Sequence, residues 1–200
     1  VGDNFNDQDT ISRLTGHCAM GHVRYSTSGG TMIRNIQPLF AEFMFGGLAV
    51  AHNGNLTNAY QLRRALVERG NIFQSTSDTE VIIHLMAISE AGHVIDRLID
   101  ALRQIDGAYS LVAMTQKKLI GVRDPAGVRP LVLGKLGDAH ILASETCALD
   151  IIGADFVRDV DPGEIIVIDA EGITSYHPFG QSKNRRFCIF EHVYFARPDS

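Results

Sequence analysis

The chain has 200 residues, of which 45% are hydrophobic and 20% are charged, and its formal net charge at pH 7 is −5. This length favours one domain or two small ones, and the composition excludes a disordered chain, a collagen and a coiled coil. Because Lys and Arg are scattered singly and in pairs, we expect neither nucleic acid nor a membrane surface as a partner. Small molecules and other proteins are the partners that this composition favours.

The cysteines and the first residues bear on the compartment. Cys18, Cys147 and Cys188 are too few and too widely spaced for a disulfide framework or a zinc motif, so we expect a reducing, cytoplasmic setting. No apolar run reaches the roughly 18 residues of a membrane span, and the polar residues 1–7 are unlike a signal peptide. Because position 1 is Val rather than Met, we expect a processed or truncated N-terminus.

The first part of the chain predicts short strands. Apolar residues bounded by Gly, Pro or Asn indicate strands over residues 17–25, 39–45 and 48–52. The last two are separated only by Gly46-Gly47, which predicts a hairpin with these glycines at its turn.

Three helices are predicted next. From Asn58 the apolar spacing is helical up to Gly70, and Asn58 with the Gln three residues later resembles a capping box. Residues 77–80 form a second capping box of Ser and Glu, which begins a helix closed by Gly92. The third predicted helix covers residues 94–102.

The remainder of the chain returns to strands, with one short helix that begins at Ser144 and runs toward Gly153. Strands and helices therefore come in blocks joined by short turns, which favours an antiparallel α+β architecture with helices outside stacked sheets. A polar, basic stretch at 180–184 indicates a boundary. The predicted strands of this part are 108–115, 119–122, 131–133, 139–143, 156–160, 165–168 and 173–176.

Three segments carry polar residues suited to binding or catalysis. Arg24 ends a predicted strand before a loop of hydroxyls and glycines, and its guanidinium can bind a carboxylate through two hydrogen bonds. Asn53-Gly54 follows a strand, and a side-chain amide beside a glycine N–H can stabilise an oxyanion. Asp78 lies in the first turn of a predicted helix and can hold an ammonium group.

Each segment also has an ordinary structural interpretation. A strand-end Arg is commonly solvated, Asn-Gly is a frequent hairpin turn, and the helix dipole stabilises an acid in the first turn. Taken together, the three segments would hold an amino acid by its charged end while its side-chain carbonyl is attacked. They supply no attacking group.

Residues 21–27, 52–58 and 77–80, in this order, resemble the glutaminase domain of class II glutamine amidotransferases, which are N-terminal-nucleophile hydrolases. The resemblance covers nearly the whole chain and implies a four-layer αββα sandwich of stacked antiparallel sheets. Later segments resemble the amidophosphoribosyltransferase branch of the family, glycosyltransferases that commit phosphoribosyl pyrophosphate to purine synthesis. These segments are 105–110, 121–131 and 190–200.

The resemblance implies a role for each site residue. Arg24 would pair with the α-carboxylate of glutamine, with Thr27 hydrogen bonding nearby, and Asp78 would hold the α-ammonium group. Asn53, through its side chain, and Gly54, through its backbone N–H, would form the oxyanion hole. The family nucleophile is a cysteine at the mature N-terminus, whose own α-amino group serves as the base.

The sequence departs from the family at its beginning. Position 1 is Val, and neither Cys18 nor Cys147 can replace the nucleophile because neither is terminal. We therefore expect residues 1–180 to be a class II glutaminase domain that lacks its first strand and its nucleophile. Residues 181–200 would lead into a missing phosphoribosyltransferase domain, and the fragment alone would be inactive.

The complete enzyme implied by the resemblance hydrolyses glutamine and passes ammonia to phosphoribosyl pyrophosphate, which gives 5-phosphoribosylamine. It would be a homo-oligomer, with Mg²⁺ in the missing domain. Some members carry a [4Fe-4S] cluster, for which Cys188 is either one ligand or simply a buried boundary cysteine. Two other functions stay open: the glutaminase domain of another class II amidotransferase, and a relative without a nucleophile that only binds an amino acid.

Overall fold

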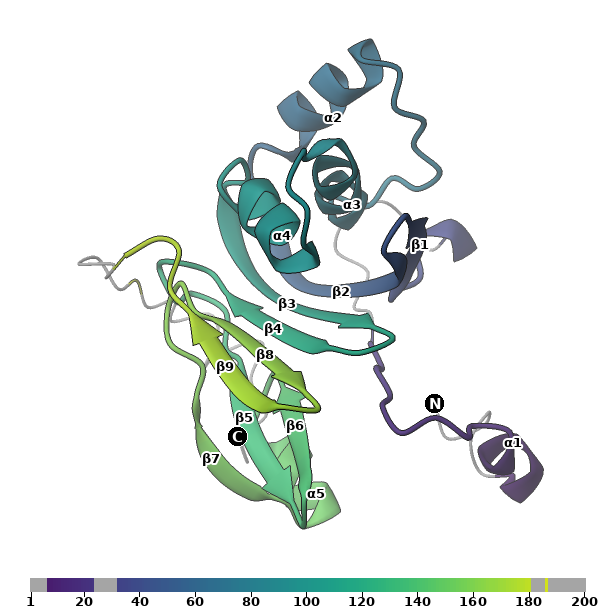
Figure 1. Cartoon of the computed structure of the whole chain (residues 1–200), viewed down its shortest axis with the longest axis vertical. Coiled ribbons are helices and arrows are strands. Elements are labelled where there is room, and N and C mark those ends of the chain that lie inside the picture. Colours follow the sequence, from purple (N-terminus) through teal and green to yellow (C-terminus); the bar gives the residue numbers. More distant parts are fainter. Residues whose placement is uncertain (1–6, 24–31, 181–185, 187–200) are drawn as a thin grey trace.

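The computed structural model describes residues 7–23, 32–180 and 186 (Figure 1). Short helices flank a series of strands. In chain order the elements are α1 (Gln8–Ser12), the 3₁₀ turn η2 (Ile33–Asn35), β1 (Leu39–Phe43), β2 (Gly46–Leu56), α2 (Ala59–Glu68), α3 (Thr79–Ile88), α4 (Val94–Leu102), β3 (Gly107–Thr115), β4 (Leu119–Arg123), β5 (Val132–Leu136), β6 (Ala139–Ala143), α5 (Cys147–Ile152), β7 (Asp155–Asp159), β8 (Ile165–Asp169) and β9 (Gly172–Tyr176).

The strands form two antiparallel sheets. The larger sheet has the order β1-β2-β3-β4-β8-β9, and the smaller one has the order β6-β5-β7. All strand pairs are antiparallel, and most neighbours are joined by short turns. The antiparallel arrangement predicted from the block pattern is confirmed.

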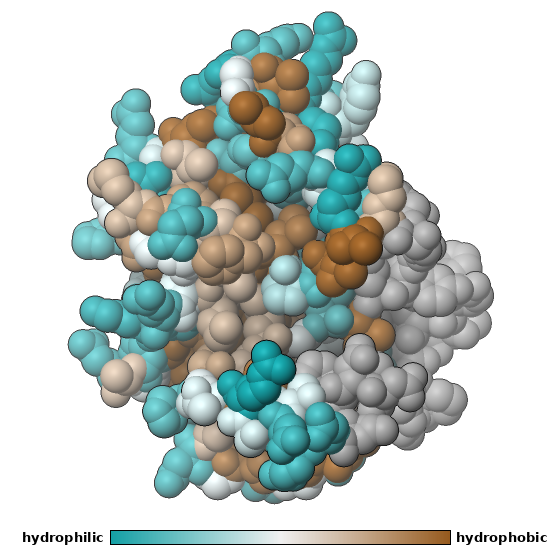
Figure 2. All heavy atoms as spheres, turned by 90° about the vertical axis from the view of Figure 1, so that its right-hand side faces the viewer, coloured by the Kyte–Doolittle hydropathy of each residue, from teal (hydrophilic) through white to brown (hydrophobic). Residues whose placement is uncertain are grey.

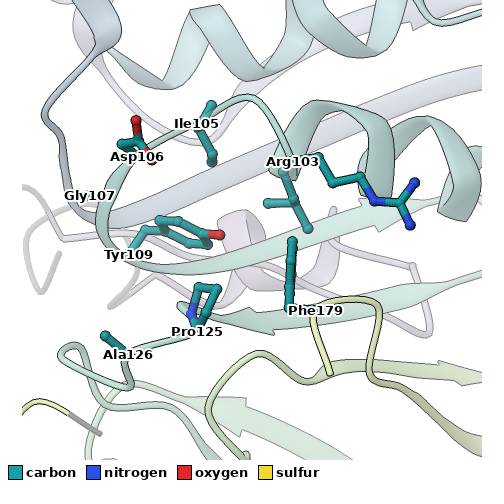
Figure 3. A pocket seen from close by; sticks show the side chains of 9 residues that line it. Arg103, Ile105, Asp106, Gly107, Tyr109, Pro125, Ala126 and Phe179 are labelled. Carbon is teal, nitrogen blue, oxygen red and sulfur yellow. The ribbon is translucent and has the colours of Figure 1, made fainter. Parts of the chain in front are cut away.

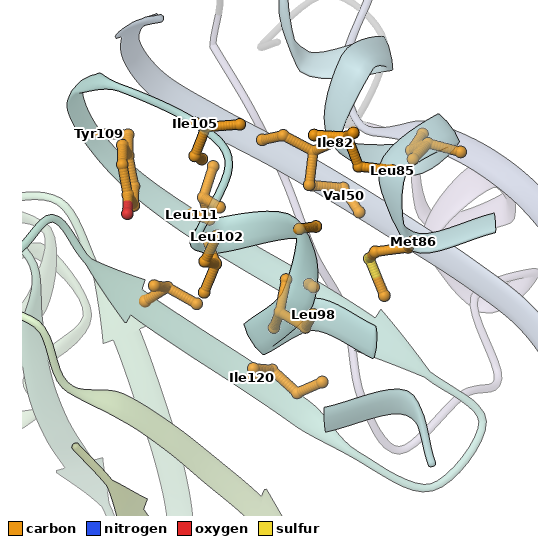
Figure 4. Close-up of a cluster of buried hydrophobic side chains, with 14 of the residues drawn as sticks. Val50, Ile82, Leu85, Met86, Leu98, Leu102, Ile105, Tyr109, Leu111 and Ile120 are labelled. Carbon is orange, nitrogen blue, oxygen red and sulfur yellow. The ribbon is translucent and has the colours of Figure 1, made fainter. Parts of the chain in front are cut away.

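Three apolar clusters separate the layers. The largest lies between the helices and the six-stranded sheet, where Leu85 of α3 and Leu98 of α4 face Leu111 of β3 (Figure 4). A second cluster lies between the sheets and includes Leu133 and Ile166. The third cluster joins the small sheet to α5. The order of layers is therefore helix, sheet, sheet, helix, as expected for the αββα sandwich (Figure 1).

The predicted strand over residues 17–25 is wrong for its described part, because residues 17–23 form no strand. A strand is stable only when a neighbour satisfies its backbone N–H and C=O groups, and no described strand pairs with this segment. Val23 is 82% exposed, so its side chain gains little from packing.

The hairpin between β1 and β2 is confirmed, but its turn consists of Met44 and Phe45 rather than the two glycines. Gly46 and Gly47 open β2. A Cβ atom at Gly47 would lie 2.8 Å from the ring of Phe40, so this glycine makes room for a cross-strand aromatic side chain. On the side of the molecule to which β1 belongs, Figure 2 shows hydrophobic residues lying among hydrophilic ones.

Neither predicted capping box forms. The Asn58 side chain donates to the Gln104 carbonyl oxygen and accepts from the Asp106 N–H, so it fixes the turn before β3 instead of capping α2. Helix α3 begins one residue later than expected, with Asp78 as its N-cap. The Glu80 carboxylate accepts from the backbone N–H groups at 74 and 75, and the buried donor at 75 needs such an acceptor.

Two other helix ends differ from the prediction. Helix α3 ends at Ile88, before Gly92, because the Ser89 hydroxyl donates to Asp100 of α4 and accepts from the Ala91 N–H. Helix α5 begins after Thr146 rather than at Ser144, and it closes at Gly153 as expected.

The ion pair between Arg158 of β7 and the buried Glu164 leads to a prediction for acid stability. The Arg158 guanidinium donates to both oxygens of Glu164 at 2.8 and 2.7 Å, and the Ser175 hydroxyl and Asp161 N–H donate to the same carboxylate. Burial would raise the pKa of Glu164, but these donors outweigh it and lower the pKa to about 2. The folded state therefore stabilises the ionised Glu164 carboxylate more than the unfolded state does.

This pair is expected to stabilise the fold fully above about pH 4.5, the ordinary pKa of Glu, and progressively less as the pH falls toward 2. Glu164→Gln should cost up to about 3 kcal/mol at pH 7, because one pKa unit corresponds to about 1.36 kcal/mol. Urea unfolding of both proteins between pH 7 and pH 2.5 measures the difference. A difference that stays constant across this range would contradict the assignment.

Candidate active site

The predicted oxyanion residues lie on β2, beyond the point where its pairing with β1 ends. Strand β1 pairs with residues 46–50 of β2, whereas β3 pairs with β2 as far as Leu56. Residues 51–56 therefore have β3 on one side and no described strand on the other. Asn53 and Gly54 are paired with Ser110 and Tyr109 inside this ladder, so the interpretation of Asn-Gly as a hairpin turn is wrong.

The pairing pattern fixes where the backbone N–H groups of this segment point. In an antiparallel ladder, successive residues direct their N–H and C=O groups to opposite sides. The Asp124 N–H donates to the Tyr109 carbonyl oxygen, so the Tyr109 backbone faces β4 and that of its partner Gly54 faces away from β3. The backbone N–H groups of His52 and Leu56, each two residues from Gly54, point the same way. We call this side of residues 51–56, which has no described strand beside it, the open edge of β2.

The two outer N–H groups on this edge are satisfied by side chains. The His52 N–H donates to Oε1 of Gln37 at 2.6 Å, and the Leu56 N–H donates to Oδ2 of Asp78 at 2.9 Å. The Gly54 N–H lies between them, and we find no acceptor for it among residues 7–23, 32–180 and 186. One backbone donor is thus directed outward, in a position to bind a ligand oxygen.

Close approach of β2 to β3 explains why this position is glycine. Gly54 has φ +152°, and a Cβ atom there would lie 2.1 Å from the Ala108 carbonyl oxygen and 2.8 Å from the Tyr109 Cα. Both obstacles are backbone atoms and cannot rotate away. Only a residue without a side chain fits, and the N–H keeps its outward direction.

The Asn53 side chain lies on the opposite face of β2 from the helices. Leu48, Val50 and Leu56 belong to the cluster under the helices, so alternation directs Asn53 toward the second sheet. Its Oδ1 accepts a hydrogen bond from the Arg129 guanidinium, and its Nδ2 donates to the Ser144 hydroxyl at 3.3 Å. The carboxamide is therefore anchored by residues that flank the small sheet.

Asp78 approaches the same edge from the N-terminus of α3. Its Oδ1 lies 3.6 Å from Nδ1 of the buried His52, and its side chain is 22% exposed. Burial would raise the pKa of Asp78, but His52 and the Leu56 N–H outweigh it and lower the pKa. The carboxylate is ionised at neutral pH and has further lone pairs with which to accept from an ammonium group.

The structure thus brings Asp78 to Leu56, two residues beyond Gly54 in the stretch of β2 that also holds Asn53, although Asp78 lies far from this stretch in sequence. The other predicted ligands of glutamine, Arg24 and Thr27, lie outside the described residues, as does Cys188. Their roles stay predictions.

Residues 22–150 match the family model of a glutamine amidotransferase domain. The chain belongs to this family. An amidophosphoribosyltransferase of Rhizobium etli is 54% identical over 204 residues, which cover 100% of this chain and 41% of the relative. The enzyme of the same name from Bacillus subtilis is 47% identical, with 95% of this chain and 40% of the relative covered.

A solved structure agrees with this amidotransferase assignment. The glutamine phosphoribosylpyrophosphate amidotransferase of B. subtilis, complexed with ADP and GMP, superimposes with a TM-score of 0.84 at 45% identity. The match covers 90% of this chain and 38% of that chain, and it bears out the N-terminal-nucleophile hydrolase fold. The amidotransferase chain spans about two fifths of the length of the curated relatives named above.

Sequence reasoning did not single out three residues that contact the predicted site residues: His52, Arg129 and Ser144. Arg129 lies 76 residues from Asn53, and Ser144 lies 91 residues away, so no local pattern links them. Both lie next to strands of the small sheet, and only the stacking of the two sheets brings them to Asn53. His52 belongs to the segment 52–58 that carries the family resemblance. Its contact with Asp78 forms only because α3 packs against β2.

A pocket of about 360 Å³ lies beside the start of β3, the strand that pairs with residues 51–56 of β2 (Figure 3). It is lined by residues that include Arg103, Asp106, Tyr109 and Phe179 and by none of the predicted site residues. Burial and the nearby Asp124 carboxylate raise the pKa of Tyr109, so its phenol is neutral at physiological pH. This pocket offers no arrangement for amide hydrolysis.

Proposed function

We propose that the chain is the glutamine-hydrolysing domain of an amidophosphoribosyltransferase. The complete enzyme releases ammonia from glutamine and transfers it to phosphoribosyl pyrophosphate, which gives 5-phosphoribosylamine, the first step of de novo purine synthesis. The observation that carries the proposal is the outward N–H of Gly54, which follows the anchored Asn53 in β2 and lies two residues before Leu56, whose N–H donates to the Asp78 carboxylate. The similarity to amidophosphoribosyltransferases over the whole chain supports it.

In the proposed reaction, Asp78 binds the α-ammonium group of glutamine and Arg24, with Thr27, binds the α-carboxylate. A cysteine thiolate attacks the side-chain amide carbon, and the carbonyl oxygen becomes an oxyanion that accepts from Asn53 Nδ2 and the Gly54 N–H. Collapse of this intermediate expels ammonia, with the thiol proton delivered to the leaving nitrogen, and leaves a thioester. Water then hydrolyses the thioester to glutamate and restores the thiol.

The proposed nucleophile is the family's N-terminal cysteine, supplied upstream of Val1. Cys18 is exposed and lies outside any strand or helix, and Cys147 is buried in α5 with its thiol 3.7 Å from Glu145. Neither carries a terminal amine that could act as the base. We use "complete enzyme" for this chain extended upstream to that cysteine and downstream through a phosphoribosyltransferase domain.

Further proposals concern the whole protein: a boundary at residues 181–200, a cytoplasmic location and a homo-oligomer. None of the described helices is long and apolar enough to cross a membrane. Within the described parts of the chain, no three His, Cys, Asp or Glu side chains are grouped to hold a metal ion. We propose that Mg²⁺ belongs to the phosphoribosyltransferase domain and that Cys188 would be one ligand of an iron–sulfur cluster in those members that carry one.

The direct test compares glutamine hydrolysis by the complete enzyme and by the 200-residue chain. Glutamate release should be measurable only for the complete enzyme, and it should be coupled to consumption of phosphoribosyl pyrophosphate. Equal turnover by both proteins would refute the N-terminal nucleophile. A complete enzyme that uses free ammonia but never glutamine would refute the proposed role of this domain.

Removing the charge of Asp78 should weaken glutamine capture. In the complete enzyme, Asp78→Asn is expected to raise the KM for glutamine about 10- to 100-fold, because a hydrogen bond between charged groups is lost. The value of kcat should fall much less, and ammonia-dependent synthesis should be unchanged. Asp150→Asn is the matched control, since Asp150 is an exposed acid in the first turn of α5. An unchanged KM in Asp78→Asn would remove this residue from the glutamine site.

A further inference from the structure

The loop between β4 and β5 is organised around one buried carboxylate. Asp124 is 0% exposed, and its two oxygens accept from the backbone N–H groups of Ala126, Val128 and Arg129 at 3.0, 3.2 and 3.1 Å. A buried carboxylate satisfied by several N–H groups holds the backbone around it in one conformation. The position of the Arg129 backbone is fixed by this arrangement.

The neighbouring Arg123 binds the same loop through its carbonyl groups. Its guanidinium donates to the carbonyl oxygens of Arg129, Val160 and Gly127 at 2.9, 2.8 and 3.2 Å. These bonds tie the loop both to itself and to the segment before β8. The loop belongs to the segment 121–131, which the family resemblance singled out and to which the proposed reaction gives no task.

The conformation of this loop places the Arg129 side chain against Asn53. The Arg129 guanidinium donates to Oδ1 of Asn53. Arginine has donors only, so the oxygen of the carboxamide must face it, and the amide nitrogen must turn to the other side. Ser144 accepts from Nδ2 at 3.3 Å, and because the amide nitrogen carries two N–H groups, one remains for a ligand oxygen.

From these contacts we propose that Arg129 is a positioning residue for the oxyanion hole, an inference that rests on the proposed function. It excludes the flipped orientation of the Asn53 amide, in which an oxygen would face the developing oxyanion and repel it. It also withdraws electron density from Oδ1, which makes the Nδ2 hydrogens better donors. The loop of residues 123–130 is the rigid support that holds the guanidinium in place.

The test measures steady-state kinetics of the complete enzyme with glutamine and with ammonia. Arg129→Gln is expected to lower the glutamine-dependent kcat about 10- to 100-fold, less than loss of the Asn53 donor itself, with the KM for glutamine within about twofold. Arg129→Lys retains a donor and should recover part of the loss. Ammonia-dependent synthesis should be unchanged in both variants.

A double-mutant cycle separates positioning from a general structural effect. In an Asn53→Ala background, Arg129→Gln should change kcat less than about twofold, because there is no carboxamide left to orient. Arg158→Gln is the control: it also removes an arginine that anchors a loop, here through Glu164, and should lower the melting temperature while kcat stays unchanged.

The outcomes distinguish the two proposals. No glutaminase activity in the unsubstituted complete enzyme would refute the proposed function itself. A slow Asn53→Ala enzyme together with a normal Arg129→Gln enzyme would overturn only the role of Arg129. Equal losses from Arg129→Gln with and without Asn53, or loss of ammonia-dependent synthesis, would also overturn it by showing that Arg129 acts on the fold.

Discussion

Asn53→Ala in the complete enzyme should lower the glutamine-dependent kcat by about 10²- to 10³-fold, the usual effect of losing one oxyanion-hole donor. The KM for glutamine should change little, because the donor is needed when charge develops on the carbonyl oxygen rather than in the bound substrate. Arg129 and Ser144 anchor the Asn53 carboxamide, so this amide is already oriented before glutamine binds. Initial rates of glutamate release across a range of glutamine concentrations separate the two constants.

Asn55→Ala provides the matched control for this substitution. Asn55 lies two residues along β2 on the same face and is exposed. Its truncation should leave kcat and KM unchanged. Normal turnover by Asn53→Ala, or an equal loss in Asn55→Ala, would remove Asn53 from the oxyanion hole.

Gly54→Ala should abolish glutamine hydrolysis and destabilise the domain by about 3 kcal/mol or more. The added methyl group would lie 2.1 Å from the Ala108 carbonyl oxygen, so β2 must move away from β3, and the outward N–H moves with it. Glutamate release and urea unfolding measure the two effects.

Gly70→Ala controls for backbone strain alone. Gly70 also has a positive φ, +89°, but a methyl group added there would meet no atom within 4 Å. This substitution should cost about 1 kcal/mol and leave catalysis intact. If Gly54→Ala were as stable and as active as Gly70→Ala, the close approach of the two strands would not matter to the site.

The fold was largely predictable because its strands are short, apolar and bounded by turn residues. The boundaries of α4 and β6 agree with the prediction, since the helical spacing from Val94 and the turn at Gly137 are strong local signals. The capping boxes failed because Asn58 and Glu80 bind backbone groups of neighbouring loops. Local patterns do not reveal such competing partners.

The site was predictable in part. Asn53, Gly54 and Asp78 lie in short segments whose residue types suit an oxyanion and an ammonium group, and the structure brings Asp78 to the stretch of β2 that holds the other two. That Gly54 lies inside a strand, with its N–H turned outward, follows only from the register of β2 with β3. The link between Arg129 and Asn53 crosses from one sheet to the other and needs the stacked layers.

A crystal structure of the complete enzyme with its N-terminal cysteine changed to alanine, soaked with L-glutamine, tests the central claim most directly. It should show the α-ammonium group on Asp78 and the side-chain carbonyl oxygen on the Gly54 N–H and Asn53 Nδ2. Glutamine bound away from the open edge of β2, for instance in the pocket beside Tyr109 and Phe179, would contradict the account.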